Sequence, residues 1–142
     1  MQVSERTLDD QAEQLDRLLT GLIKKYQFRD RNEVCCEGIT VSQCYALKEL
    51  GAQGSVTMSR LAELMCLSLS ALTRVVDQLE RRRYAKRRRL ASDRRVCCVE
   101  LTATGRNLLR VVETKIRRSE KEVLARLSDR DRAGLITGLR RL

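Results

Sequence analysis

Residues 58–101 decide the fold; they read MSRLAELMCLSLSALTRVVDQLERRRYAKRRRLASDRRVCCVEL. Apolar residues recur at helical spacing in the first half of this stretch and predict a short helix over 56–65, with Thr57 as its N-cap. After a break of two residues, Ser68 is the expected N-cap of a second helix that runs to about residue 82. This order predicts a helix-turn-helix.

The second half of the stretch has the pattern of a basic β-hairpin. Alternating and β-branched residues predict strands over 84–89 and 96–101, joined by a polar turn. Residues 81–95 hold nine basic and one acidic side chain, which leaves 20 of the 29 basic and 18 of the 19 acidic residues for the rest of the chain. Such a concentrated basic patch is typical of a site that binds a polyanion. The alternative is a basic stretch that is exposed to solvent and has no partner.

Helices are predicted on both sides of this stretch. Apolar residues over 8–26 recur at spacings of three, four and seven, which indicates an amphipathic helix. A capping box formed by Thr40 and Gln43 begins another helix, which Gly51 and Gly54 are expected to end.

Beyond the hairpin, a long helix is predicted from about Thr102 and a short last helix from about Ser128. The sequence contains no proline and only seven glycines, which favours long helices joined by short turns. The predicted fold class is therefore mainly α with a small β-hairpin.

The second helix of the helix-turn-helix opens with small and hydrogen-bonding side chains. In this motif the second helix enters the major groove of DNA, and its first residues meet base edges. Small side chains let the backbone approach the bases, Arg binds guanine through two hydrogen bonds, and Thr bonds a base or touches a thymine methyl. The residues predicted on its outer face are Ser70, Ala71, Thr73, Arg74, Asp77 and Gln78. The DNA-binding candidates among them are Ser70, Ala71, Thr73, Arg74 and Gln78, together with the N-cap residue Ser68. The alternative, a solvent-exposed amphipathic helix, is disfavoured by the basic hairpin that follows.

Several motifs in the correct order over residues 40–109 resemble the multiple-antibiotic-resistance regulator (MarR) family. MSRLAEL at 58–64 and LSALTRVVDQLER at 69–81 are similar to its helix-turn-helix. SDRR at 92–95 is similar to its wing signature, and LTATG at 101–105 is similar to the start of its next helix. The resemblance implies a winged helix-turn-helix transcription regulator that is not an enzyme and requires no cofactor.

The resemblance also implies an assembly and a mode of binding. One domain over 1–142 would hold a DNA-binding core over about 40–101 and dimerisation helices over about 5–27 and 103–142. Each subunit of a homodimer would place its recognition helix in a major groove of near-palindromic double-stranded DNA and its wing tip in a minor groove. Family members usually repress nearby genes, and many release DNA when a small molecule binds or a cysteine is modified.

Carried over residue by residue, the resemblance assigns DNA contacts to both elements. Ser70, Thr73 and Arg74 would meet bases or nearby phosphates. Arg94 would enter the minor groove, and Asp93 would orient Arg94 by a salt bridge. The residues expected at the DNA backbone are Lys86, Arg87, Arg88 and Arg89, and Arg95 completes the DNA-binding candidates.

The chain departs from the family's pattern after the recognition helix. The family usually has a Gly and an aliphatic pair where this chain has Arg83, Tyr84 and Ala85. Gly would relieve a left-handed turn, so Arg83 is expected to carry a steric cost there. The entry to the wing is therefore expected to be reshaped, and the first wing strand to be more mobile.

The cysteines are expected to be reduced. The N-terminus lacks an apolar signal segment and no window of 18 apolar residues occurs, which predicts a cytoplasmic protein without a membrane span. The six cysteines are Cys35, Cys36, Cys44, Cys66, Cys97 and Cys98. No CxxC is present, and the absence of His excludes a Cys/His zinc site.

Cys35, Cys36 and Cys44 form the candidate effector site. Two or three thiolates there would bind a soft metal or metalloid such as trivalent arsenic, or would sense oxidants. The alternative is that these residues are small buried hydrophobes, which is the preferred interpretation for the other three cysteines. In the second strand, Cys97 is expected to face the core and Cys98 the opposite side.

The sequence leaves two other functional classes open. An enzyme using Cys35 and Cys36 for thiol or metal chemistry would lack His, the commonest general base, and a glycine-rich phosphate loop. A nonspecific nucleic-acid or RNA-binding module is disfavoured by an aromatic content of 3%. Turnover of arsenate or a disulfide substrate would indicate the first class, and equal affinity for operator and scrambled duplex the second.

Replacing all three cysteines of the candidate effector site tests its role. A Cys35→Ser/Cys36→Ser/Cys44→Ser variant is expected to bind DNA as the wild type does but to keep the DNA in the presence of arsenite or thiol reagents. Fluorescence anisotropy with labelled duplex measures both properties. A variant that still releases DNA as the wild type does would refute the hypothesis.

Overall fold

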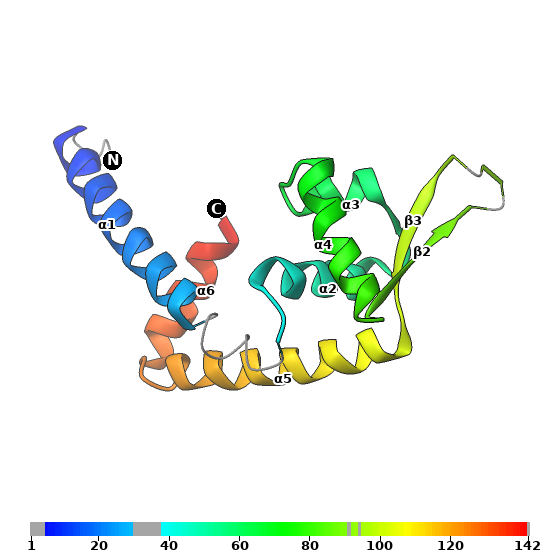
Figure 1. The fold of residues 1–142 in the computed structure, drawn as a ribbon. Helices are drawn as coiled ribbons and strands as arrows, with labels where there is room; N and C mark the ends of the chain where they lie inside the picture. Colours follow the sequence, from blue (N-terminus) through cyan, green and yellow to red (C-terminus); the bar gives the residue numbers. More distant parts are fainter. Residues whose placement is uncertain (1–4, 30–37, 91, 94, 142) are drawn as a thin grey trace. The chain divides into compact units, whose positions relative to one another are not determined.

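The computed structural model describes residues 5–29, 38–90, 92–93 and 95–141 (Figure 1). These residues belong to two units, one within residues 1–44 and the other within residues 45–142. The first unit contains helix α1 (Glu5–Arg29) and the beginning of helix α2 (Val41–Gln53). Helix α1 includes the whole amphipathic segment predicted over 8–26, so that prediction is confirmed.

The ends of α2 follow partly from the predicted signals. The backbone N–H of Thr40 donates to Gln43 Oε1 at 3.0 Å, and the N–H of Gln43 donates to Thr40 Oγ1 at 3.3 Å, which is the predicted capping box. Gly54 follows the helix with a φ of +77°. The expectation that Gly51 ends the helix is wrong, because α2 continues through it. A Cβ on Gly51 would lie 2.3 Å from Leu109 Cδ2, so the absent side chain makes room for Leu109.

Helix α3 (Met58–Leu64) begins two residues later than predicted. Val56 and Thr57 form a short strand, β1, and pair with Val99 and Cys98. Thr57 nevertheless caps the helix as predicted, since its Oγ1 accepts a hydrogen bond from the N–H of Arg60 at 3.2 Å.

The turn between α3 and helix α4 (Leu69–Arg81) depends on one left-handed residue. Cys66 has a φ of +51°. Its N–H donates to the carbonyl of Glu63, and the N–H of Leu67 donates to the carbonyl of Ala62, both at 3.0 Å. This pair of bonds is a Schellman motif, which ends α3 and directs the chain into α4.

The remaining two strands form the predicted hairpin. Strands β2 (Ala85–Arg89) and β3 (Cys97–Leu101) are antiparallel, and β1 completes a sheet with the order β1-β3-β2. The ribbon shows the β2–β3 hairpin extending beyond α3 and α4 (Figure 1). The third strand, β1, was not predicted.

The expected burial of the two cysteines in β3 is wrong. Cys98 is buried, with 6% of its surface exposed, whereas Cys97 is only half-buried. Cys98 lies in the central strand between its register partners Thr57 and Arg88. Cys97 pairs only with Arg89, next to the turn of the hairpin, where β1 no longer accompanies β3.

Aliphatic side chains from α2, α3, α4, α5 and the sheet form the core of the second unit, as the low aromatic content requires. The most buried come from α2, α3, α4 and β3 and are Leu47, Leu50, Leu61, Leu72, Val76, Leu79 and Val99. Their removal from water is the main favourable contribution to folding of this unit.

Helix α5 (Ala103–Leu124) starts in close contact with the chain that leaves α4. Thr102 Oγ1 accepts from the N–H of Gly105 at 3.0 Å and donates to the carbonyl of Arg83 at 2.6 Å. A Cβ on Gly105 would lie 1.9 Å from the carbonyl oxygen of Tyr84, so glycine is required at this position.

The chain ends in a second C-terminal helix, α6 (Asp129–Arg141), which begins beside Ser128 as predicted. Among the described residues, no helix is long and apolar enough to cross a membrane. The predicted fold class, mainly α with a small β-sheet that includes a hairpin wing, is confirmed.

The left-handed turn predicted at Arg83 is present. Arg83 has a φ of +59°, its N–H donates to the carbonyl of Glu80, and the N–H of Tyr84 donates to the carbonyl of Leu79. Helix α4 therefore ends in a second Schellman motif without the usual glycine. The left-handed conformation costs a non-glycine residue about 1–2 kcal/mol.

Replacing Arg83 by glycine is expected to stabilise the protein. Arg83→Gly relieves the left-handed strain, and part of that gain is offset by the greater backbone freedom of glycine in the unfolded chain, so the free energy of unfolding should rise by about 1 kcal/mol. Urea unfolding at a fixed protein concentration measures this change. Arg81→Gly removes the same charge inside the helix and should destabilise by about 0.5–1 kcal/mol. If the Arg83→Gly protein is no more stable than the wild type, the claim that Arg83 is strained is wrong.

Candidate nucleic-acid interface

Helix α4 has one buried and one exposed face, in the predicted orientation. Leu72, Val76 and Leu79 are fully buried. Arg74 and Gln78 are exposed on the other side of the helix. Among the described residues, no acidic side chain forms an ion pair with Arg74. The Arg74 guanidinium is therefore available to an external anion or base edge.

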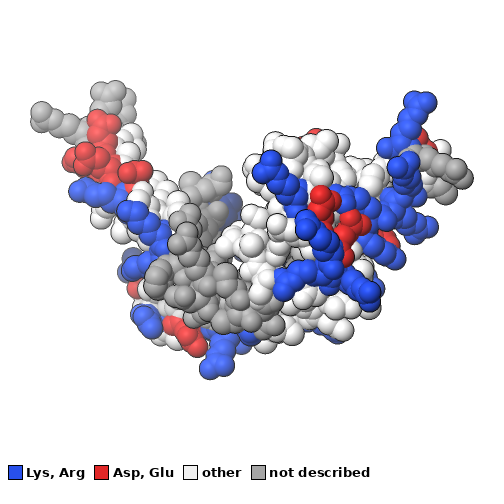
Figure 2. All heavy atoms as spheres, viewed as in Figure 1, with Lys and Arg blue, Asp and Glu red and all other residues white. Residues whose placement is uncertain are grey.

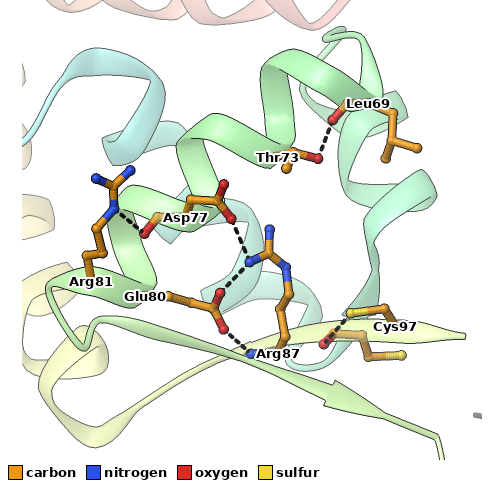
Figure 3. A network of polar contacts seen from close by, with 8 residues as sticks. Leu69, Thr73, Asp77, Glu80, Arg81, Arg87 and Cys97 are labelled. Atoms are coloured by element: carbon orange, nitrogen blue, oxygen red, sulfur yellow. Dashed lines mark hydrogen bonds and ion pairs between the residues drawn. The ribbon is translucent and has the colours of Figure 1, made fainter.

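The first turn of α4 is held by hydroxyl groups. Ser68 Oγ accepts from the N–H of Ala71 at 3.2 Å, which confirms the predicted N-cap, and lies 3.1 Å from Ser70 Oγ. Thr73 Oγ1 donates its proton to the carbonyl of Leu69 at 2.7 Å (Figure 3). The two serine hydroxyls are exposed, and the Thr73 oxygen keeps its capacity to accept a hydrogen bond.

The basic side chains of β2 point to two sides of the hairpin. Lys86 Nζ lies 2.9 Å from Glu100 Oε1, across the strand pair. Arg88 and Arg89 are exposed at the end of β2 that leads into the turn of the wing. Figure 2 shows Lys and Arg side chains gathered over α4 and the hairpin, with a few acidic side chains among them. The predicted basic surface is therefore formed by both elements together.

Arg87 differs from its neighbours because it contacts α4. Its Nη1 lies 2.7 Å from Asp77 Oδ1 and also pairs with Glu80 Oε2, and its backbone N–H donates to Glu80 Oε1 at 2.7 Å (Figure 3). Partial burial acts to lower the pKa of the Arg87 guanidinium, but its hydrogen bond to Asp77 and the attraction of both carboxylates outweigh this effect and raise the pKa. The guanidinium is thus held inside the protein's own ion-pair network.

The tip of the wing is a hydrogen-bonded turn. Asp93 Oδ1 accepts from the N–H of Arg95 at 2.9 Å, the carbonyl of Asp93 accepts from the N–H of Val96 at 3.0 Å, and Leu90 N–H donates to the carbonyl of Val96 at 3.1 Å. Arg94, predicted to enter the minor groove and to pair with Asp93, lies outside the described residues. Asp93 therefore orders the tip by a bond to backbone, which the sequence analysis did not anticipate.

Glu100 is the acidic residue at the base of the wing. The hydrogen bond from Lys86 lowers the pKa of the Glu100 carboxyl, partial burial opposes this, and the positive charges of Lys86, Arg88 and Arg106 lower the pKa further. The net shift is downward, so the folded state favours the ionised carboxylate.

The candidate effector cysteines are only partly within the described residues. Cys44 is buried, whereas Cys35 and Cys36 lie outside the described part of the chain. Within the described ranges, no group of three or more Cys, Asp or Glu residues is arranged to hold a metal ion. Cys66, which was expected to be structural, is exposed at the left-handed position of the helix-turn-helix.

The network around Arg87 is the functional feature that the sequence analysis missed. Asp77 and Glu80 are three residues apart and therefore share one side of α4. Two carboxylates on a helix expected to meet DNA were a signal that a basic partner must neutralise them. The pattern did not identify which of the adjacent arginines that partner is.

The fold and this basic surface define a winged helix-turn-helix DNA-binding protein. Residues 39–97 match the MarR family. The chain is 32% identical over 123 residues to the uncharacterised HTH-type transcriptional regulator YdgJ of Bacillus subtilis (strain 168), which is 82% of this chain and 75% of that protein. It is also 30% identical over 100 residues to the HTH-type transcriptional repressor MdtR of the same organism, covering 70% of this chain and 64% of that protein. The chain belongs to the MarR family and is a DNA-binding transcription regulator, not an enzyme.

Solved structures share the whole fold. FabT of Streptococcus pneumoniae in complex with DNA superposes with a TM-score of 0.82 at 21% identity, over 92% of this chain and 93% of that chain. A MarR mutant from E. coli complexed with operator DNA gives a TM-score of 0.79 at 22% identity, over 93% and 95% of the two chains. These similarities confirm the predicted winged helix architecture.

The lowered pKa of Glu100 predicts a pH-dependent contribution to stability. Since the pKa is lower in the folded than in the unfolded chain, the carboxylate stabilises the fold above its ordinary pKa, and this contribution is lost as the pH falls through the folded value. Glu100→Gln should be less stable than wild type near neutral pH, and the difference should shrink on acidification. Unfolding free energies at about pH 7 and about pH 3 measure it.

Glu63→Gln is the matched control for Glu100→Gln. Glu63 pairs with Arg60 on the surface, with 66% of its side chain exposed, so its replacement should change stability little at any pH. A difference between Glu100→Gln and wild type that is the same at both pH values would contradict the assigned role of Glu100.

Proposed function

We propose that this regulator acts as a homodimer that binds near-palindromic double-stranded DNA, with α4 in the major groove and the wing at an adjacent minor groove. The observation that carries the proposal is the exposed Arg74 on α4, which pairs with no acidic side chain of the described residues, beside a strongly basic hairpin. Arg is the side chain best suited to bind guanine in the major groove, and the basic strand supplies attraction to phosphates. MarR of E. coli, which shares the fold, is known in complex with operator DNA.

Exposed apolar side chains on the terminal helices support the dimer. In α1 the exposed large hydrophobic residues are Leu8, Leu15, Leu18, Leu19, Leu22 and Ile23. In α6, Leu135, Ile136 and Leu139 are exposed, and no residue of that helix is buried within the single chain. Apolar stripes of this length are unfavourable in water and are typical of surfaces that another chain covers. The proposed dimerisation region therefore comprises α1, α5 and α6, and the proposed DNA-binding core spans residues 40–101 of the sequence.

The proposed regulatory mode is repression that ends when an effector acts. The relative MdtR is a transcriptional repressor. One proposed trigger is modification of, or soft-metal binding by, Cys35, Cys36 and Cys44, in a cytoplasm that keeps thiols reduced. The burial of Cys44 means that a reagent reaches it only after a local rearrangement, which would couple reaction to a change of structure.

A small molecule is the other proposed trigger. A hollow of about 620 Å³ lies beside the beginning of α5, a volume typical of ligand sites. Leu50, Leu101 and Leu109 contribute apolar surface to its lining, and Arg106 and Arg110 contribute positive charge. The one carboxylate among its described lining residues, Glu100, pairs with Lys86. These groups suit a small apolar molecule with an anionic group.

Replacing Arg74 tests the proposed interface. Arg74→Ala removes the proposed base contact and should weaken binding to the preferred duplex by about 1–3 kcal/mol, with relaxed specificity at one base position in each half-site. The duplex is taken from the DNA upstream of the gene or selected from random sequences. Anisotropy titrations with excess nonspecific competitor give the affinities, and the stoichiometry is expected to be two protomers for each duplex.

Arg118→Ala is the control for Arg74→Ala. Arg118 is exposed on α5, where it pairs with Glu122, and its loss removes the same charge far along the chain from the recognition helix. It should leave specificity unchanged. Equal effects of the two substitutions, or equal affinity of the wild type for preferred and scrambled duplexes, would overturn the proposed interface.

A further inference from the structure

We propose that Arg87 does not contact DNA phosphates but is the internal counter-ion of the recognition helix, neutralising Asp77 and Glu80 at the DNA-facing surface. This inference rests on the proposed function, because it concerns how α4 and the wing present charge to the same DNA. It changes the role expected for Arg87, which the sequence analysis grouped with Lys86, Arg88 and Arg89 as phosphate contacts.

The geometry leaves Arg87 little freedom to reach a phosphate. Only 27% of its side chain is exposed, against 59% for Lys86. Asp77 Oδ1 and Glu80 Oε2 both contact Nη1, and Glu80 Oε1 also accepts the backbone N–H of the same residue (Figure 3). To contact a phosphate, the guanidinium would have to abandon two charge-assisted hydrogen bonds.

The two carboxylates would otherwise oppose DNA binding. Asp77 and Glu80 lie on the same helix as Arg74, and their side chains are 42% and 30% exposed. Unpaired carboxylates within a Debye length of phosphates, about 8 Å at physiological salt, are repelled by them. Among the described residues, Arg87 is the side chain that forms ion pairs with both acids. Arg81 also lies near Asp77, but its Nε donates to the Asp77 carbonyl and leaves the carboxylate to Arg87.

The same contact ties the wing to the helix. Strand β2 is an edge strand, since the sheet order is β1-β3-β2, and the N–H of Arg87 donates to a side chain of α4 in place of another strand. Glu80 thus caps the open edge of the wing while Arg87 neutralises Glu80. Loss of Arg87 would leave the two carboxylates without a counter-ion and would also detach the wing from α4. A single substitution therefore does not separate the two roles.

A variant in which all three side chains are uncharged separates the two roles. Arg87→Gln leaves two uncompensated carboxylates and should weaken DNA binding by about tenfold or more. The triple variant Asp77→Asn/Glu80→Gln/Arg87→Gln removes all three charges and keeps a side chain capable of hydrogen bonding at each position. Its affinity for the preferred duplex should return at least to the wild-type level, and the slope of log K against log salt should match that of the wild type. Arg88→Gln, an exposed neighbour on β2, should lower that slope by about one.

The alternative role gives the opposite results. If Arg87 contacts a phosphate, the triple variant stays as weak as Arg87→Gln and its salt slope falls by about one, as for Arg88→Gln. Circular dichroism melts select a temperature at which every variant is folded. If Arg87→Gln alone does not fold, comparison of the triple variant with the wild type still decides between the two roles. If the proposed function itself is wrong, the wild-type protein will show no preference for any duplex, which is a different result from either of these.

Discussion

The contact between Glu80 of α4 and Arg87 of β2 connects the two elements that form the basic surface. Helix α4 is anchored to the core by Leu72, Val76 and Leu79, whereas β2 pairs with β3 alone and has one open edge. Glu80 binds both the backbone N–H and the guanidinium of Arg87. The wing is therefore held against α4 by a side chain of that helix, which the proposed reading of two grooves requires.

Two left-handed residues give the motif its turns. Cys66 ends α3 and Arg83 ends α4, each in a Schellman motif and each at a position where glycine is usual. The chain then passes so close to α5 that Gly105 must lack a side chain beside the Tyr84 carbonyl. The left-handed conformation of Arg83 and the close approach at Gly105 together determine the path of the chain from α4 into the wing. The chain follows this path although position 83 is not the usual glycine.

Local signals in the sequence predicted most of the fold. The capping residues Thr40, Ser68 and Thr57 each form the expected hydrogen bonds, because a cap depends only on neighbours three residues away. The recognition helix, the hairpin and the family were predicted for the same reason: their patterns are contiguous. The strand at Val56 was missed because a strand of two residues is too short to show an alternating pattern, and because its pairing with Val99 depends on tertiary structure.

Contacts between elements were not predictable in the same way. Gly51 lies inside α2 and leaves room for Leu109, which is far along the chain, so the role of this glycine could not be predicted from the local pattern. The charges of Asp77, Glu80 and Arg87 are visible in the sequence, but their pairing depends on how β2 folds back onto α4. Candidate DNA-binding residues were therefore identified as a set, while the structure was needed to show which of them are exposed and which pair within the protein.

Methylation interference tests most directly the claim that α4 and the wing read a symmetric DNA site. Guanine N7 lies in the major groove and adenine N3 in the minor groove, so methylation of each reports on one groove. The account predicts that N7 methylation blocks binding in two half-sites related by twofold symmetry, and that N3 methylation blocks binding in adjacent minor-groove positions. Binding that tolerates N7 methylation throughout the duplex, or that is blocked in one unsymmetrical tract, would contradict it.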